Sequence, residues 1–188
     1  MVPRGGMAVM MRPIFLVGYM GCGKTTLGTV LARHMGLRYI DLDEFVEKQC
    51  GMTVVGIFET MGQNRFRELE TAALRQVAAM TGVIVGCGGG TPCHSGNMDV
   101  MNDAGVTVWL TTSPERITAR LLLPEQKRKR PKVNTLDDAD VLPLVKKELQ
   151  ARSCYYGKAR VQFDSTDIET ALATERTARR LADLLQRM

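Results

Sequence analysis

The sequence predicts an α/β fold in three layers (α/β/α), with helices on both faces of a central five-stranded parallel sheet. Short apolar runs alternate with helical stretches along the chain, which is the order that a doubly wound parallel sheet requires. The first apolar run leads into a glycine-rich loop, and a helical stretch follows that loop. At 188 residues the chain is long enough for one domain with a sizeable core. We therefore expect a single domain over residues 7–188.

The glycine-rich loop, Gly18–Thr25, reads G-x-x-x-x-G-K-T, the pattern of a phosphate-binding loop. A loop between a buried strand and a helix aims backbone N–H groups and the positive end of the helix at one point. Lys24 can then reach the β- and γ-phosphates of a nucleotide, and the Thr25 hydroxyl can ligate Mg²⁺. The loop predicts nucleotide binding, against the alternative of a glycine-rich turn with an unrelated lysine.

The remaining elements follow from the same alternation. Five runs are expected to form the strands: Ile14–Val17, Arg38–Ile40, Val83–Gly86, Val106–Leu110 and Arg160–Phe163. The first four are short and apolar, as strands covered on both faces are. Eight stretches are expected to form helices: Lys24–Met35, Asp43–Cys50, Val54–Met61, Asn64–Met80, Gly96–Asp103, Pro114–Leu122, Val141–Tyr156 and Ile168–Arg187. Ligands of such a sheet bind beyond the carboxyl ends of its strands, around the phosphate-binding loop.

Residues 123–140 interrupt the alternation. They are charge-dense, with prolines at 124 and 131 and a basic run over Lys127–Lys132. We expect a mobile surface loop, called here the predicted lid. The basic run would close over the γ-phosphate and exclude water; the alternatives are a solvated charged run and a nucleic-acid contact.

Two acidic residues, Asp41 and Asp43, close the second predicted strand. Alternation along a strand puts both carboxylates on the same side of the chain. One could bind a Mg²⁺-bound water while the other meets a substrate hydroxyl. The alternative is that Asp43 only caps the helix that follows.

Three further features could bind an anion. Arg67 and Glu70 are i,i+3 neighbours in a helix, so they form either a preorganised clamp for a carboxylate or phosphate or a solvated helix face. Gly88–Gly90 follows a buried strand and allows close approach of a ligand to the backbone, unless it is a simple turn. Arg152 is a second anion anchor or an ordinary surface arginine.

Composition limits the class of protein. The net charge of +5 suits an anionic ligand but is too small to predict nucleic-acid binding. The five cysteines are odd in number and contain no C-x-x-C, which indicates reduced thiols and a cytoplasmic protein. No segment is apolar enough to predict a membrane span. Residues 1–6 resemble a protease-site remnant of an expression tag and are left out of the predicted domain.

Taken together, the motifs resemble those of the shikimate kinases, in the P-loop nucleoside-monophosphate-kinase-like group. The chain shows them in the family's order: the phosphate-binding loop, D-x-D at Asp41 and Asp43, I-F-x-x-x-G-x-x-x-F-R-x-x-E over 57–70, G-G-G over 88–90, R-P at 130–131 and R-x-x-x-Y over 152–156. The resemblance extends from about residue 12 to the C terminus. It implies a P-loop kinase fold with a mobile lid, and transfer of the γ-phosphoryl group of ATP to the 3-hydroxyl of shikimate in aromatic amino-acid biosynthesis.

The resemblance also implies a role for each matched residue. On the nucleotide side these are Gly21, Cys22, Gly23, Lys24, Thr25, Thr26, Arg120 near adenine, and Arg130 as the lid arginine on the phosphates. Mg²⁺ would be held by Thr25 and, through water, by Asp41. Shikimate would be bound by Asp43, Phe58, Arg67, Gly88, Gly89, Gly90 and Arg152, with Glu70 holding Arg67 and Phe66 also beside the ring. Lys24, Asp43 and Arg130 would serve catalysis, Asp43 by orienting the attacking hydroxyl or by accepting its proton.

The chain departs from the family pattern at a few positions. Gln63 stands where a glutamate is usual, and Lys132-Val133 follows Arg130-Pro131 where two leucines are common. The Tyr155-Tyr156 pair leaves two possible registers after Arg152. We expect ATP and shikimate as ligands, a monomer, and neither nucleic acid nor membrane as a partner. The rival predictions are another small-molecule kinase, such as a gluconate or nucleotide kinase, and a non-catalytic nucleotide-dependent binding protein.

Overall fold

The computed structural model describes residues 12–188, so the predicted tag remnant lies outside the described residues. Five parallel strands form one sheet in the order β2-β3-β1-β4-β5. Their bounds are β1 (Ile14–Val17), β2 (Arg38–Asp41), β3 (Val83–Gly86), β4 (Val106–Thr111) and β5 (Val161–Asp164). All five predicted strands are therefore present, each within one residue of its expected bounds.

Helices connect and cover the strands. They are α2 (Lys24–Met35), α3 (Leu42–Cys50), α4 (Val54–Ala78), the 3₁₀ turn η1 (Thr91–Cys93), α5 (Asn97–Ala104), α6 (Pro114–Leu121), α7 (Pro124–Arg128), α8 (Pro131–Asn134), α9 (Asp138–Tyr156) and α10 (Ala171–Gln186). None of the helices within residues 12–188 combines the length and the apolar composition that crossing a bilayer requires.

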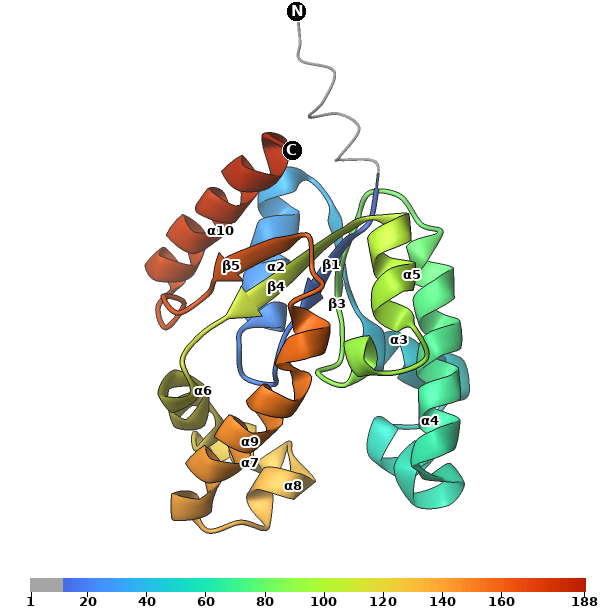
Figure 1. Cartoon of the computed structure of the whole chain (residues 1–188), viewed down its shortest axis with the longest axis vertical. Helices are drawn as coiled ribbons and strands as arrows, with labels where there is room; N and C mark the ends of the chain where they lie inside the picture. The colour runs from blue at the N-terminus through green and yellow to red at the C-terminus, as the bar shows by residue number, and fades with distance from the viewer. Residues whose placement is uncertain (1–11) are drawn as a thin grey trace, which may run out of the picture.

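The three layers follow from the alternation of side chains along β1. Ile14 and Leu16 point into a core shared with α2 and α10, whereas Phe15 and Val17 point into a core shared with α3, α4 and α5. Figure 1 shows these two helical layers on opposite sides of the sheet. The predicted three-layer fold is confirmed.

A third apolar cluster lies beyond one end of the sheet. Tyr19 of the phosphate-binding loop packs there with residues of α6, α8 and α9, among them Leu121, Val133 and Tyr156. Figure 1 shows α6 to α9 gathered below the sheet, away from the C terminus. This cluster attaches the predicted lid to the phosphate-binding loop.

Three element boundaries differ from the prediction. The two helices expected over 54–61 and 64–80 are joined as α4, with a kink at Gly62, whose φ of 79° and ψ of 170° are not helical. The predicted lid contains two short helices, α7 and α8, and the start of α9 in place of one continuous loop. Helix α10 begins three residues later than expected, because the Thr170 side chain caps it by accepting from the N–H of Ala173.

Candidate active site

The phosphate-binding loop joins β1 to α2, as predicted. Gly23 precedes α2 with a φ of 99°, and no side chain bonds to the first N–H groups of the helix. This positive φ favours glycine, and a Cβ atom at Gly23 would also displace the end of the Ile168 side chain. The N terminus of α2 is thus left available for an anion.

Lys24 folds back across this loop. Its Nζ donates to the carbonyl oxygens of Gly18 at 2.8 Å and Tyr19 at 3.0 Å, and lies 3.8 Å from the Cys22 sulfur. Cys22 is buried, and its carbonyl accepts from the Ser165 hydroxyl at 2.8 Å. Cys22 therefore contributes backbone rather than an accessible thiol to the loop.

Asp41 ends β2 and links it to two other elements. Its Oδ1 accepts from the N–H of Asp43 at 3.0 Å, which caps α3, while its Oδ2 accepts from the Thr25 hydroxyl at 3.4 Å. The alternative that Asp43 is the helix cap is therefore wrong, because Asp41 fills that place. The Asp43 side chain stays available for a ligand.

Asp43 lies within a group of charges. Burial raises its pKa to about 6, assisted by the negative charges of Asp41 and Glu70 and opposed by Lys24 and Arg67. A carboxyl group with this pKa changes protonation state close to neutral pH, where it can hold a hydroxyl either as acceptor or as donor.

Arg67 and Glu70 form the predicted pair. Arg67 Nη1 lies 2.7 Å from Glu70 Oε2, and the Glu70 side chain is only 1% exposed. The other Glu70 oxygen accepts from the Thr91 hydroxyl at 2.5 Å. Arg67 Nε is buried without a hydrogen-bond partner. The pair is a buttressed clamp rather than a solvated helix face.

The triple glycine lies between two guanidinium groups. A Cβ atom at Gly90 would come within 2.6 Å of Arg67 Nη2, and one at Gly89 would lie 3.6 Å from Arg152 Nη1. The Gly89 carbonyl accepts from the Tyr156 hydroxyl at 2.5 Å, and Tyr156 is fully buried. Tyr156, and not the exposed Tyr155, therefore faces the site.

The aromatic residues predicted to flank the acceptor lie against each other. The ring centroids of Phe58 and Phe66 are 4.6 Å apart, and the Arg67 guanidinium lies 5.1 Å from the Phe66 centroid. The pair thus supports the clamp arginine from one side.

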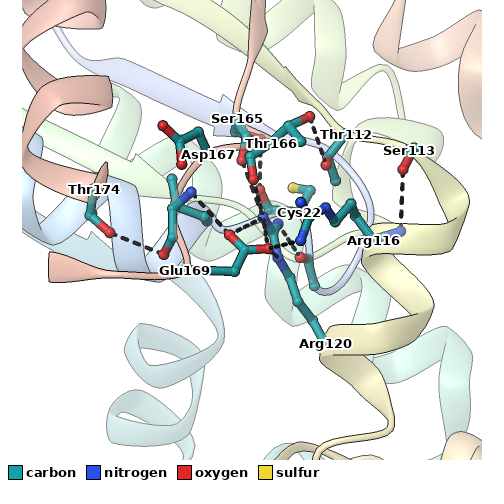
Figure 2. Close-up of polar contacts among 12 residues, drawn as sticks. Cys22, Thr112, Ser113, Arg116, Arg120, Ser165, Thr166, Asp167, Glu169 and Thr174 are labelled. Atoms are coloured by element: carbon teal, nitrogen blue, oxygen red, sulfur yellow. Dashed lines mark hydrogen bonds and ion pairs between the residues drawn. The ribbon is translucent and has the colours of Figure 1, made fainter. Parts of the chain in front are cut away.

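Arg120 lies on the opposite flank of the phosphate-binding loop. Figure 2 shows it extending from α6 between that loop and the segment after β5. It donates to the carbonyls of Gly21 at 3.0 Å and Thr166 at 2.8 Å, and its Nε donates to Glu169 at 3.2 Å. With its donors engaged in this way, the guanidinium can offer a ligand mainly its flat face.

Arg130, in the predicted lid, is held within that segment. Its Nη1 donates to the Gln126 carbonyl at 2.9 Å and to Gln126 Oε1 at 2.7 Å. Lys127 is also engaged locally, by Asp138 at 2.6 Å. The basic run is therefore part of a folded segment.

These residues surround a cavity of about 740 Å³. Its walls come from every part of the site: Met20, Gly21, Gly23, Lys24, Thr25, Thr26, Asp41, Asp43, Glu44, Gly86, Cys87, Gly88, Gly89, Arg120, Leu123, Gln126, Lys129, Arg130, Ile168 and Glu169. Of the predicted site residues, five do not line the cavity: Cys22, Phe58, Arg67, Gly90 and Arg152. Arg67 and Arg152 nevertheless approach it through the glycine loop.

Sequence reasoning missed several wall residues. Ile168 and Glu169 lie in the segment before α10 and match no motif. Gln126 and Lys129 belong to the charged segment, in which the motifs single out Arg130 but not these two residues. The basic character of the lid was a usable signal for Lys129; no signal in the sequence singles out Ile168.

A family model described as shikimate kinase matches residues 20–185 of the chain. The chain belongs to the shikimate kinase family. A shikimate kinase from Phocaeicola vulgatus is 43% identical over 159 residues, which cover 85% of this chain and 90% of that protein.

Two solved structures extend this likeness to the fold. The shikimate kinase of Bacteroides thetaiotaomicron has a TM-score of 0.89 at 37% identity, covering 94% of this chain and 99% of that one. The shikimate kinase of Acinetobacter baumannii, solved in complex with shikimate, has a TM-score of 0.80 at 28% identity and covers 96% of each chain. The predicted family is confirmed.

Proposed function

We propose that this protein is an ATP-dependent kinase that transfers the γ-phosphoryl group of ATP to the 3-hydroxyl of shikimate. The observation that carries the proposal is the pair of guanidinium groups, from Arg67 and Arg152, on either side of the glycine loop opposite the phosphate-binding loop. Each arginine has its own glutamate partner, so both are oriented for a carboxylate before it arrives. A small polyhydroxy acid fits this arrangement better than a nucleobase does.

The nucleotide side follows from the loop. The N terminus of α2 and Lys24 would bind the phosphates, and Arg130 would reach them from the predicted lid. Arg120 and Ile168 would contact the adenine. Positioning and charge neutralisation would supply most of the rate, because phosphoryl transfer has a loose transition state that needs little covalent help.

Mg²⁺ fits the residues present. Thr25 and Asp41 offer oxygen donors beside the phosphate-binding loop, and Mg²⁺ prefers oxygen ligands while keeping several waters. The ion would neutralise charge on the phosphoryl oxygens when bound. Asp43 would hold the attacking hydroxyl, as acceptor of its proton or as a guide to its direction. We further propose that the domain spans residues 7–188, works as a monomer and is cytoplasmic.

A coupled ADP-release assay tests the proposal. We expect ADP production to depend on shikimate, with little turnover on gluconate or nucleoside monophosphates. ADP release that shikimate does not stimulate would overturn the assignment, and turnover on gluconate instead would favour the rival small-molecule kinase. Tight polynucleotide binding with a steep salt dependence, without turnover, would favour the non-catalytic alternative.

A further inference from the structure

One carboxylate on α9, that of Glu148, receives donors from two distant segments of the chain and from its own helix. Its Oε2 accepts from the Tyr19 hydroxyl at 2.8 Å and from Arg152 Nη2 at 3.1 Å, and its Oε1 pairs with Lys132 Nζ. Tyr19 belongs to the phosphate-binding loop and Lys132 to α8 of the predicted lid, whereas Arg152 lies on α9 itself, four residues after Glu148. No motif in the sequence pointed to Glu148.

The environment of Glu148 keeps it ionised. Its side chain is only 12% exposed, and burial alone would raise the pKa; hydrogen bonds from Lys132 and Tyr19 and the charge of Arg152 outweigh burial and lower it. The Arg152 guanidinium also lies 5.3 Å from the centroid of the Tyr19 ring. A partly buried carboxylate held by two cations and a hydroxyl has few alternative positions.

Glu148 pairs with Arg152 in the same way that Glu70 pairs with Arg67. In each pair a poorly exposed glutamate binds one guanidinium nitrogen and leaves another beside the glycine loop: Arg67 Nη2 next to Gly90 and Arg152 Nη1 next to Gly89. The difference is that Glu148 has a second oxygen engaged by the lid, whereas the second oxygen of Glu70 is engaged by Thr91. Of the two pairs, Arg152–Glu148 is therefore connected to the predicted lid, and Arg67–Glu70 is not.

We propose that Glu148 is a positioning residue that fixes Arg152 for the acceptor carboxylate and, through Lys132, couples the predicted lid to that anchor. The part that concerns the acceptor rests on the proposed function. The part that concerns the lid does not, because the contact between Lys132 and Glu148 involves only residues of the protein.

Kinetics of Glu148→Gln test the first part, because glutamine keeps the shape and removes the charge. We expect KM for shikimate to rise about fivefold to tenfold, since hydrogen bonds to a charged acceptor are stronger than those to a neutral one. KM for ATP should stay within about twofold. Glu115→Gln is the matched control, because Glu115 of α6 pairs at the surface, at 3.0 Å, with Lys146 of α9, the helix that carries Glu148. This variant should leave both constants unchanged.

A double-mutant cycle with Lys132→Met tests the coupling. Lys132 is 60% exposed, so its replacement should fold even if Glu148→Gln does not. We expect Lys132→Met alone to raise KM for shikimate about twofold to fivefold, and to have no effect in the Glu148→Gln background. An unchanged KM in Lys132→Met, or effects of the two changes that simply add, would overturn the coupling.

Limited trypsin digestion tests the lid without any substrate. Cleavage after Lys127, Arg128 and Lys129 reports how firmly the lid is attached. We expect Glu148→Gln and Lys132→Met to speed these cleavages several-fold and Lys146→Met to leave them unchanged. Equal rates in all variants would overturn the lid part of the proposal. A wild-type protein that shows no shikimate-dependent ADP release would refute the proposed function separately, and the digestion rates would still decide whether Glu148 holds the lid.

Discussion

At the scale of single residues, burial distinguishes side chains that the sequence presents as equals. Arg65–Glu68 and Arg67–Glu70 share one helix and one i,i+3 spacing, and both pairs form, at 2.6 and 2.7 Å. Glu68 is 64% exposed and Glu70 is 1% exposed. An exposed pair contributes little, whereas a buried glutamate fixes its arginine in one position. Only the second pair can act as a clamp.

This contrast supplies a matched experiment. We expect Arg67→Ala to raise KM for shikimate by roughly 10- to 100-fold, because a charge-assisted contact contributes about 1.5–3 kcal/mol. Arg65→Ala removes the same side chain from the solvated pair and should change KM less than twofold. Steady-state kinetics with varied shikimate measure both. An unchanged KM in Arg67→Ala would show that another group binds the carboxylate.

The raised pKa of Asp43 predicts how the activity depends on pH. Its pKa of about 6 means that the carboxylate form is lost as pH falls through 6. If the ionised form holds the attacking hydroxyl, kcat/KM for shikimate should fall about tenfold per pH unit below 6. Asp43→Asn should be nearly inactive at every pH and lack this limb. A wild-type profile that stays flat between pH 5 and 7 would contradict the assignment.

The same pKa predicts an effect on stability. The folded-state value lies above the ordinary 3.8, so the native protein binds this proton more tightly than the unfolded chain does. Asp43 therefore weakens the fold as pH rises from about 4 to about 6, and its full cost is present above 6. Asp43→Asn should raise the free energy of unfolding by about 3 kcal/mol at pH 8 and by less than about 1 kcal/mol at pH 4. Urea denaturation at the two pH values measures this difference, and an equal effect at both would contradict it.

At the scale of elements, the sequence predicted the alternating strands and helices. It missed helix kinks and caps, which depend on contacts with neighbouring residues. Strands β1 and β3 were predictable because their apolar runs are buried on both faces. The kink at Gly62 was not, because glycine permits a positive φ without requiring it. Asp41 caps α3 in place of Asp43 because the helix begins two residues earlier than a cap at Asp43 would require, directly after β2. Such boundaries are the least certain part of a sequence-based assignment.

The site was predictable to a similar degree. Residues in compact motifs, such as Lys24, Gly88 and Gly89, lie at the cavity as expected. Glu148 and Ile168 were missed because their roles arise from contacts with Tyr19 and Gly23, more than a hundred residues away in the sequence. Such contacts leave no local pattern.

The glycine loop, residues 88–90, should control the position of the Arg67 side chain. A Cβ at Gly90 would lie 2.6 Å from Arg67 Nη2, which is the far end of a side chain, so the arginine can move where backbone could not. Gly90→Ala should therefore displace the clamp while leaving the melting temperature within a few degrees of wild type. We expect KM for shikimate to rise by about tenfold or more, with KM for ATP little changed. A loss of stability without a change in KM would show that the loop is a structural turn.

At the scale of the whole molecule, the cavity is a property of the complete fold. Its walls come from the loop after β1 and the start of α2, from the end of β2 and the start of α3, and from the loop after β3. Helix α6, the predicted lid and the segment after β5 complete them. The contributing residues extend from Met20 to Glu169, and the parallel sheet brings them together because all of its strands end on the same side. Unfolding any one layer separates these walls, so ligand binding should stabilise the protein as a unit.

Nucleotide binding should therefore raise the melting temperature of the protein. Mg·ADP at a hundred times its dissociation constant should stabilise the folded state by about 2.7 kcal/mol, if the unfolded chain does not bind it. For a domain of this size the melting temperature should then rise by roughly 5–10 °C. Lys24→Met removes the cation that lies across the phosphate-binding loop and should abolish most of the shift at the same nucleotide concentration. Lys146→Met, at the surface of α9, should keep it. Equal shifts in the two variants would mean that Mg·ADP binds elsewhere, because a ligand held by this loop must sense the loss of Lys24.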